Sequence, residues 1–252
     1  MADIQLRTMR DDEWDAVAEL IHESTNAWYV GHGHQAIFPG PPSDARLFCE
    51  VYEAIDPGCC LVAEDTGKQR LAGSCFYHPR PTHVSLGIMN VRSEYFGQRV
   101  ARRLLDAICK VADEEDKPLR LVSSAMNLDS FSLYTRAGFV PRMLFHDMTM
   151  PVPADGLPVE PPAERALVRD ATVDDVPHIV ALEAELVGIV REHDYRYFIE
   201  NNLGAWHVSV MEREGDEQGI DGFLVSIGHS ASNMLGPGVM RDDRAAAALM
   251  HA

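Results

Sequence analysis

Residues that could do chemistry lie close together in segment 127–139, which reads as one short helix. Asn127 stands at its start, Tyr134 seven residues later, and the pair Gly138-Phe139 at its end. Asn is a preferred helix N-cap, and Gly suits the left-handed position that ends a helix. A tyrosine phenol can act as a general acid. The segment therefore places a phenol, that of Tyr134, on a short capped helix; packing of its ring on a sheet is one reading of this residue.

The turn between a strand expected near residues 83–91 and a helix expected at 98–115 is a second candidate site. The first turn of a helix has unpaired backbone N–H groups and a partial positive charge, which together hold a pyrophosphate. Small residues, here Gly97 and Ala101, let the backbone approach phosphate oxygens closely. The helix also carries an apolar stripe that is expected to bury against a sheet, formed by Val100, Leu104, Leu105 and Ile108. The turn could thus bind a phosphate-bearing ligand; a simple turn before a helix, without a ligand, is the alternative.

The two segments together resemble the GNAT superfamily of acetyl-CoA-dependent N-acetyltransferases, over residues 4–149. The cofactor loop of that family is usually written Gln/Arg-x-x-Gly-x-Gly/Ala, and the match is partial. Phe96 stands at the usual Gln or Arg, and Arg99 stands at the central Gly. The interval between the segments holds one helix, a turn and one strand, as the GNAT fold requires. The resemblance implies that acetyl-CoA binds as co-substrate at Met89, Asn90, Val91, Gly97, Gln98, Arg99, Val100, Ala101, Arg102 and Asn127.

The same resemblance implies roles for individual groups. Tyr134 would protonate the departing sulfur, and Asn127 would contact the pantetheine arm as well as cap its helix. The acyl carbonyl would be polarised by backbone N–H groups between Met89 and Val91, with Asn90 acting through its main chain. Gly138 and Phe139 would be structural, as a helix C-cap and a core aromatic.

The implied activity is direct transfer of the acetyl group to an amine of a small molecule or peptide, without a covalent enzyme intermediate. A catalytically silent acyl-CoA-binding or structural GNAT module is the alternative. Arg99 could add charge to the pyrophosphate or crowd the loop, and in the second case it favours this alternative. An enzyme that uses a longer acyl-CoA is a third reading.

A general base is not evident. The strand at residues 82–91 carries no carboxylate, where many GNAT relatives have one. His83, Ser85 acting through a water, or Tyr29 could serve, and nothing in the sequence selects among them.

The segment 31–34, Gly-His-Gly-His, suggests a metal site, but two histidines lack the further ligands that zinc requires. We therefore expect no metal and assign His32 and His34 to a loop on the acceptor side. Trp28, Tyr29 and Phe38 lie in the same region, where they could shape an acceptor pocket or simply pack the loop.

The composition is that of an ordinary globular protein, with 46% hydrophobic and 24% charged residues among 252. A net charge of −17 argues against nucleic acid and anionic membranes as partners, and it weakly favours cationic substrates such as amines. The first residues do not form a signal peptide, and no apolar stretch approaches membrane-spanning length. Five cysteines lack a metal-type spacing and are expected to be reduced, which predicts a cytoplasmic protein.

Residues 151–163 are a Pro-rich linker, which divides the chain into a GNAT domain at 1–150 and a second domain at 164–252. Segment 166–182 echoes segment 4–20, and a hairpin pattern at 206–225 echoes that at 60–76. The second domain is therefore expected to be a partial GNAT-like copy; chance similarity or a truncated chain are the alternatives. A half copy exposes a sheet edge, so we expect it to pack against the first domain or against a second subunit in a homo-oligomer.

The predicted fold class is α/β, a mixed central sheet with helices on its faces. Strands are expected at 4–8, 59–65, 71–78, 83–91, 119–125 and 142–149. Helices are expected at 12–24, 43–55, 98–115 and 128–137.

Overall fold

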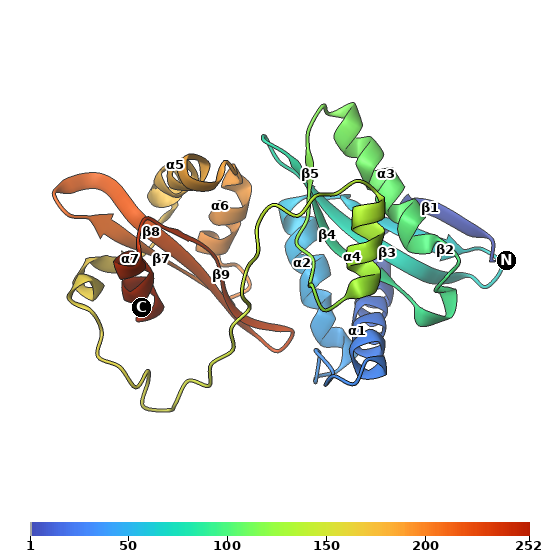
Figure 1. Cartoon of the computed structure of the whole chain (residues 1–252), viewed down its shortest axis with the longest axis horizontal. Helices are drawn as coiled ribbons and strands as arrows, with labels where there is room; N and C mark the ends of the chain where they lie inside the picture. The colour runs from blue at the N-terminus through green and yellow to red at the C-terminus, as the bar shows by residue number, and fades with distance from the viewer. Residues whose placement is uncertain (1) are drawn as a thin grey trace.

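The computed structural model describes residues 2–252, except for the side chains of residues 216–218. It contains a five-stranded and a four-stranded sheet, which lie side by side (Figure 1). The first sheet has the order β1-β2-β3-β4-β5. Its strands are β1 (Ile4–Thr8), β2 (Cys60–Asp65), β3 (Arg70–Pro79), β4 (Val84–Val91) and β5 (Leu119–Arg120). All neighbours are antiparallel except β4 and β5, which are parallel, so the sheet is mixed as predicted.

Helices cover both faces of the first sheet (Figure 1). They are α1 (Trp14–Gly31), α2 (Arg46–Ile55), α3 (Val100–Glu114) and α4 (Leu128–Arg136). The side chains of α1 pack with those of β2 and β3 in one apolar cluster, and the stripe on α3 packs with the opposite face of the sheet in another. The predicted stripe is confirmed, because Val100, Leu104, Leu105 and Ile108 are all buried. The α3 face and the α1 face of the sheet are named after these two helices below.

The pairing of β4 with β5 stops after two residues. Val84 lies opposite Leu119 and Ser85 opposite Arg120, and no further pair follows. On its other side, β4 is bulged, since Met89 pairs with Cys75 and Leu86 with Tyr77, which leaves two β4 residues facing one β3 residue. A bulge bends and twists the strand that carries it. The edge of β4 from residue 86 to 91 is therefore unpaired on the side toward β5.

Two strand predictions were wrong. The strand expected at 119–125 ends at Arg120, and residues 142–149 form neither strand nor helix. A strand needs a partner edge, and β5 offers only two paired residues, while Pro141 and Pro151 limit hydrogen bonding at both ends of the segment. As a result Leu144 and Met148 are 80% and 89% exposed, which is unusual for large apolar side chains.

The second sheet has the order β6-β7-β8-β9, with all neighbours antiparallel. Its elements are β6 (Val168–Asp170), α5 (Val176–Val187), α6 (Glu192–Glu200), β7 (Trp206–Arg213), β8 (Asp216–His229), β9 (Ser232–Met240) and α7 (Asp243–Met250). This succession of one strand, two helices, three strands and one helix is also that of β1 to α3. Residues 151–162, within the predicted linker, contain no helix or strand.

The two sheets also begin with the same ion-pair arrangement. Arg7 on β1 donates two hydrogen bonds to Glu13 at the start of α1, at 2.7 and 2.6 Å, and a third to Glu64 on β2 at 2.7 Å. On the second sheet, Arg169 bonds both oxygens of Asp175 at 2.8 Å and Glu212 on β7 at 2.6 Å. In each case one arginine ties the first strand to the first helix and to the second strand.

The second sheet packs against the first through α2 and α6. Arg80 is only 7% exposed and bridges Asp56 of the first half, at 2.7 Å, to Asp194 on α6, at 3.0 Å. An apolar cluster lies beside it and includes Leu47 and Val51 of α2 with Ile227 of β8. From the sequence we expected residues 164–252 to pack against the first domain or against a second subunit. The structure shows contacts between the two halves of one chain. No helix in the described part of the chain combines the length and apolar character needed to cross a membrane.

Candidate active site

Backbone N–H groups line the unpaired edge of β4. The N–H of Arg92 donates to Ala72 O on the β3 side at 2.9 Å. Successive N–H groups of a strand point to opposite edges, so those of Met89 and Val91 point away from β3, toward the unpaired side. These are the N–H groups assigned to the acyl carbonyl from the sequence.

The loop before α3 has the backbone of a phosphate cradle. Gly97 and Arg99 have φ values of +74° and +64°, in the left-handed region. The helix makes its first backbone bond from Arg103 N–H to Arg99 O at 3.0 Å, which leaves the N–H groups of Val100, Ala101 and Arg102 free to face a ligand. Arg99 thus takes the conformation usual for a Gly, and its exposed side chain does not fill the loop.

The neighbouring charged and polar side chains of this loop are partly engaged. Arg102 bonds Asp106 one turn further along α3, at 2.7 Å, and Gln98 donates to Glu94 O at 3.0 Å. The side chain of Arg99 makes no hydrogen bond or ion pair with any described residue. It is therefore the cation of this loop that is available to an anionic ligand.

Helix α4 begins and ends as predicted. The side chain of Asn127 accepts a hydrogen bond from Ser130 N–H at 3.0 Å, which confirms the N-cap. Gly138 has φ +97°, and Phe139 packs edge-on against Tyr134 at a ring distance of 5.8 Å. The structural roles of Gly138 and Phe139 are thus confirmed, and contact of Asn127 with a pantetheine arm stays a prediction.

Tyr134 belongs to the apolar cluster on the α3 face and is 9% exposed. Burial raises the pKa of its phenol to about 12, and the nearby Cys75 thiol adds to the rise. The phenol therefore stays protonated, and so remains a hydrogen-bond donor, throughout the physiological pH range. The packing role and the donor role are compatible in this geometry.

The side chain of Asn90 lies on the α1 face, and its role was not foreseen from the sequence. Its Nδ2 donates to Ser24 Oγ at 2.8 Å and to Thr25 Oγ1 at 3.0 Å, both on α1. Its Oδ1 and the Oγ of Ser74, the residue opposite on β3, are buried and have no partner among the described residues. One signal was present in the sequence: a polar residue at an inward position of an apolar strand.

The three candidates for the general base lie in two different places. His83 and Ser85 lie where β4 is still paired with β5 or just before it, several residues from Val91. Burial, with nearby Arg120 and Arg80, lowers the pKa of His83 to about 4, so it is a poor proton acceptor. Tyr29 lies at the end of α1, against the ring of His34.

The end of α1 approaches the start of α4. Trp28 Nε1 donates to Asp129 Oδ2 on α4 at 3.2 Å, and the Trp28 ring stacks on His32 at 4.1 Å. Helices from opposite faces of the sheet thus meet beyond the unpaired edge of β4. His32 and His34 have aromatic neighbours, and the described residues contain no group of three metal-ligating side chains.

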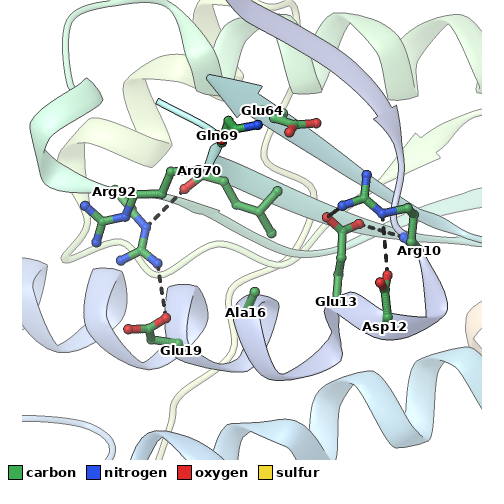
Figure 2. A pocket seen from close by; sticks show the side chains of 10 residues that line it. Arg10, Asp12, Glu13, Ala16, Glu19, Glu64, Gln69, Arg70 and Arg92 are labelled. Carbon is green, nitrogen blue, oxygen red and sulfur yellow. Dashed lines mark hydrogen bonds and ion pairs between the residues drawn. The ribbon is translucent and has the colours of Figure 1, made fainter. Parts of the chain in front are cut away.

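A cleft of about 350 Å³ lies on the α1 face, beside Arg92 (Figure 2). Its charged side chains pair with one another, as Arg92 with Glu19 at 3.6 Å and Arg10 with Glu13 at 2.8 Å (Figure 2). Such a lining offers little apolar surface to an acyl chain or a pantetheine arm.

The cysteines do not form a nucleophilic site. All five are free, and burial raises the pKa of Cys49 and Cys75 to about 12. Since the thiolate is the nucleophile, these two thiols are unreactive at neutral pH.

Comparison with known proteins agrees with this geometry. Residues 15–139 match the profile of the acetyltransferase (GNAT) family. Among solved structures, a protein described as an acetyltransferase from Pyrococcus horikoshii aligns over 98% of this chain and 74% of its own, with 14% identity and a TM-score of 0.69. An acetyltransferase from Trypanosoma brucei covers 59% of this chain and 100% of its own, with 17% identity and a TM-score of 0.42. Comparison with curated protein sequences gave no significant match.

Because the identity is low, the likeness to the Pyrococcus horikoshii structure concerns the fold alone. It extends over both sheets. The matched family region contains the bulged β4, the loop before α3 and the whole of segment 127–139, which carries Tyr134. Through residues 15–139, the chain belongs to the acetyltransferase (GNAT) family.

Proposed function

We propose that this chain is an acetyl-CoA-dependent N-acetyltransferase. One observation carries the proposal: Met89 and Val91 on the unpaired edge of β4 share one apolar cluster with Val100, the first residue of α3, and with Tyr134. The α3 N-terminus is suited to the pyrophosphate of CoA, and the β4 edge is suited to the thioester carbonyl. Asn127, Gln98 and the remaining residues of the loop would line the path between them.

In the proposed reaction a neutral amine attacks the carbonyl carbon of the thioester. The C–N bond forms, the C–S bond breaks, and one proton passes in net from the amine nitrogen to the sulfur. Negative charge that develops on the carbonyl oxygen would be met by the N–H groups of Met89 and Val91. No covalent bond to the protein is required.

The burial of Tyr134 refines its role. A phenol with a pKa of about 12 is a weaker acid than an ordinary thiol, whose pKa is about 8.5. Complete proton transfer from Tyr134 to a thiolate would therefore be uphill. We infer that Tyr134 donates a hydrogen bond to the sulfur as its charge develops, and that the proton reaching the product thiol comes in net from the amine.

The alternative is a module that binds acyl-CoA without turnover. The absence of a carboxylate on β4 and the low pKa of His83 favour it, because neither supplies a base. Arg99 does not add support for it, because its side chain is exposed and its backbone has the left-handed conformation usual for a Gly. The acceptor is proposed to be an amine of a small molecule or peptide, and the acidic surface is consistent with a cationic one. A cytoplasmic location remains a prediction from the sequence.

We further infer that residues 164–252 are a partial repeat of the first half. The shared order of elements and the matching bonds of Arg7 and Arg169 support this reading. In the second copy, β9 and α7 correspond to β4 and α3. The proposed chemistry concerns the first half, which carries Tyr134 and the β4 edge.

Two measurements test the proposed function. Calorimetric titration with acetyl-CoA and with CoA reports binding, and release of free thiol in the presence of a panel of primary amines reports turnover. Turnover of any amine supports the enzyme, and binding without turnover across the panel supports the silent module. No binding of either ligand contradicts both.

A further inference from the structure

We propose that the side chain of Asn90 is a positioning residue that fixes the acyl-binding edge of β4 against α1. The inference rests on the proposed function, because it concerns the N–H groups that would hold the thioester carbonyl. From the sequence, only the main chain of Asn90 was assigned a role; the proposal concerns its side chain.

The edge of β4 is paired on one side only. Beyond Ser85 no described strand pairs with it on the β5 side, whereas residues 89–91 pair with β3 after a bulge between Leu86 and Met89. A bulge bends and twists the strand that carries it, so the rotation of β4 beyond the bulge depends on further contacts. Twisting would rotate the N–H groups of Met89 and Val91 away from a bound carbonyl.

Asn90 lies between these two residues and crosses from the sheet to α1. Both hydrogens of its Nδ2 are used, one by Ser24 and one by Thr25. Ser24 is itself fixed, because its hydroxyl donates to Leu20 O at 2.6 Å. The two bonds run to adjacent residues of one rigid helix, so they define both the position and the rotation of the β4 backbone at Asn90.

The backbone of Asn90 is also held from the neighbouring strand. A Cβ placed on Gly73 of β3 would lie 2.8 Å from Asn90 O, so β3 approaches this residue as closely as glycine allows. Close packing on one side and the bonds to α1 on the other leave the N–H of Val91 a single direction. Preorganised donors of this kind act in the transition state, where misplacement by 1 Å can cost about 100-fold in rate.

The experiment compares Asn90→Ala with Ser74→Ala, a matched control. Ser74 lies opposite Asn90 on the same face, and its hydroxyl has no partner among the described residues, so its removal should leave kcat unchanged. For Asn90→Ala we expect kcat to fall roughly ten- to 100-fold, with the Kd for CoA within about threefold of wild type. Thr25→Val should lower kcat less, and it should add little in the Asn90→Ala background, since both remove the same bond.

A spectroscopic readout separates positioning from loss of structure. With acetyl-CoA labelled at the carbonyl carbon, the infrared C=O stretch should shift to lower frequency on binding to the wild type and to Ser74→Ala. In Asn90→Ala the band should return toward its solution frequency or broaden. An unshifted band in the wild type would count against carbonyl binding at the β4 edge, and thus against the proposed function. The other outcome concerns Asn90 alone. If the wild-type band shifts as expected, and a folded Asn90→Ala protein shows the same band and the same kcat, the role of Asn90 is overturned while the proposed function stands.

If Asn90→Ala does not fold, Thr25→Val carries the same test through the bond it removes. A folded Thr25→Val protein with wild-type kcat and an unchanged carbonyl band would also overturn the inference.

Discussion

Replacement of Arg99 by Gly and by Ala separates two properties of the loop before α3. Arg99 holds a left-handed backbone, with φ +64°, at the residue that precedes the helix. It also offers an exposed guanidinium without a partner among the described residues. The Ala variant keeps the Cβ and removes the charge, whereas the Gly variant removes both.

The magnitudes follow from these two properties. A left-handed conformation costs an L-residue about 1–2 kcal/mol. Glycine avoids this cost, but its greater conformational freedom in the unfolded state cancels part of the gain in stability. We expect the Gly variant to be about 1 kcal/mol more stable than the Ala variant, which raises Tm by roughly 2–4 °C for a chain of this size. An exposed charge pair is worth about 0–1 kcal/mol; at low salt we take the upper part of this range, about 0.6–1 kcal/mol, so loss of the guanidinium should weaken CoA binding about three- to fivefold in both variants.

Thermal unfolding and calorimetry with CoA at two salt concentrations measure these effects. The binding difference between wild type and both variants should shrink at high salt, because exposed charges are screened. Equal Tm values for the Gly and Ala variants would refute the strain argument. Wild-type affinity in both variants at low salt would refute contact between Arg99 and the pyrophosphate.

Three further outcomes are expected. Tyr134→Phe should lower kcat roughly ten- to 100-fold while CoA affinity is retained. In the wild type, ionisation of Tyr134 should cause no loss of rate below about pH 11. The rate of thiol release, measured as a function of pH, tests both expectations. Gly73→Ala should reduce kcat and lower the Tm, because the new Cβ would meet Asn90 O at 2.8 Å; circular dichroism and turnover report the two losses. The hydrogen bond from Arg7 lowers the pKa of Glu13 below its ordinary value of 4.5. The ionised Glu13 therefore stabilises the fold above pH 4.5, and this stabilisation is lost as the pH falls through the pKa that Glu13 has in the folded protein. Glu13→Gln should therefore lower Tm at pH 7 and flatten the decline of Tm between pH 5 and pH 3.

Local patterns were sufficient to predict most of the first half. The apolar stripe of α3 and the caps of α4 depend on neighbouring residues, and both are present as expected. The strand expected at 142–149 depends on a partner edge, which the short β5 does not supply, so its sequence alone could not decide it.

The candidate site was predictable in its backbone and less so in its side chains. The strand that ends at Val91 and the helix that follows it lie where the sequence predicted them, while the binding roles of Met89, Val91 and the loop stay predictions. The left-handed backbone of Arg99 could not be read from an arginine, which rarely adopts it. The bonds of Asn90 to α1 depend on the register of β4 and the rotation of α1, two non-local quantities.

Retained catalysis depends on where acetyl-CoA binds, and a crystal structure of the chain with acetyl-CoA measures this directly. We predict the thioester carbonyl oxygen within hydrogen-bonding distance of the N–H of Met89 or Val91, the sulfur beside the Tyr134 hydroxyl, and the pyrophosphate at the N-terminus of α3. Acetyl-CoA bound in the charged cleft beside Arg92, or bound with its carbonyl away from β4, would contradict the assignment of this edge as the acyl-binding site.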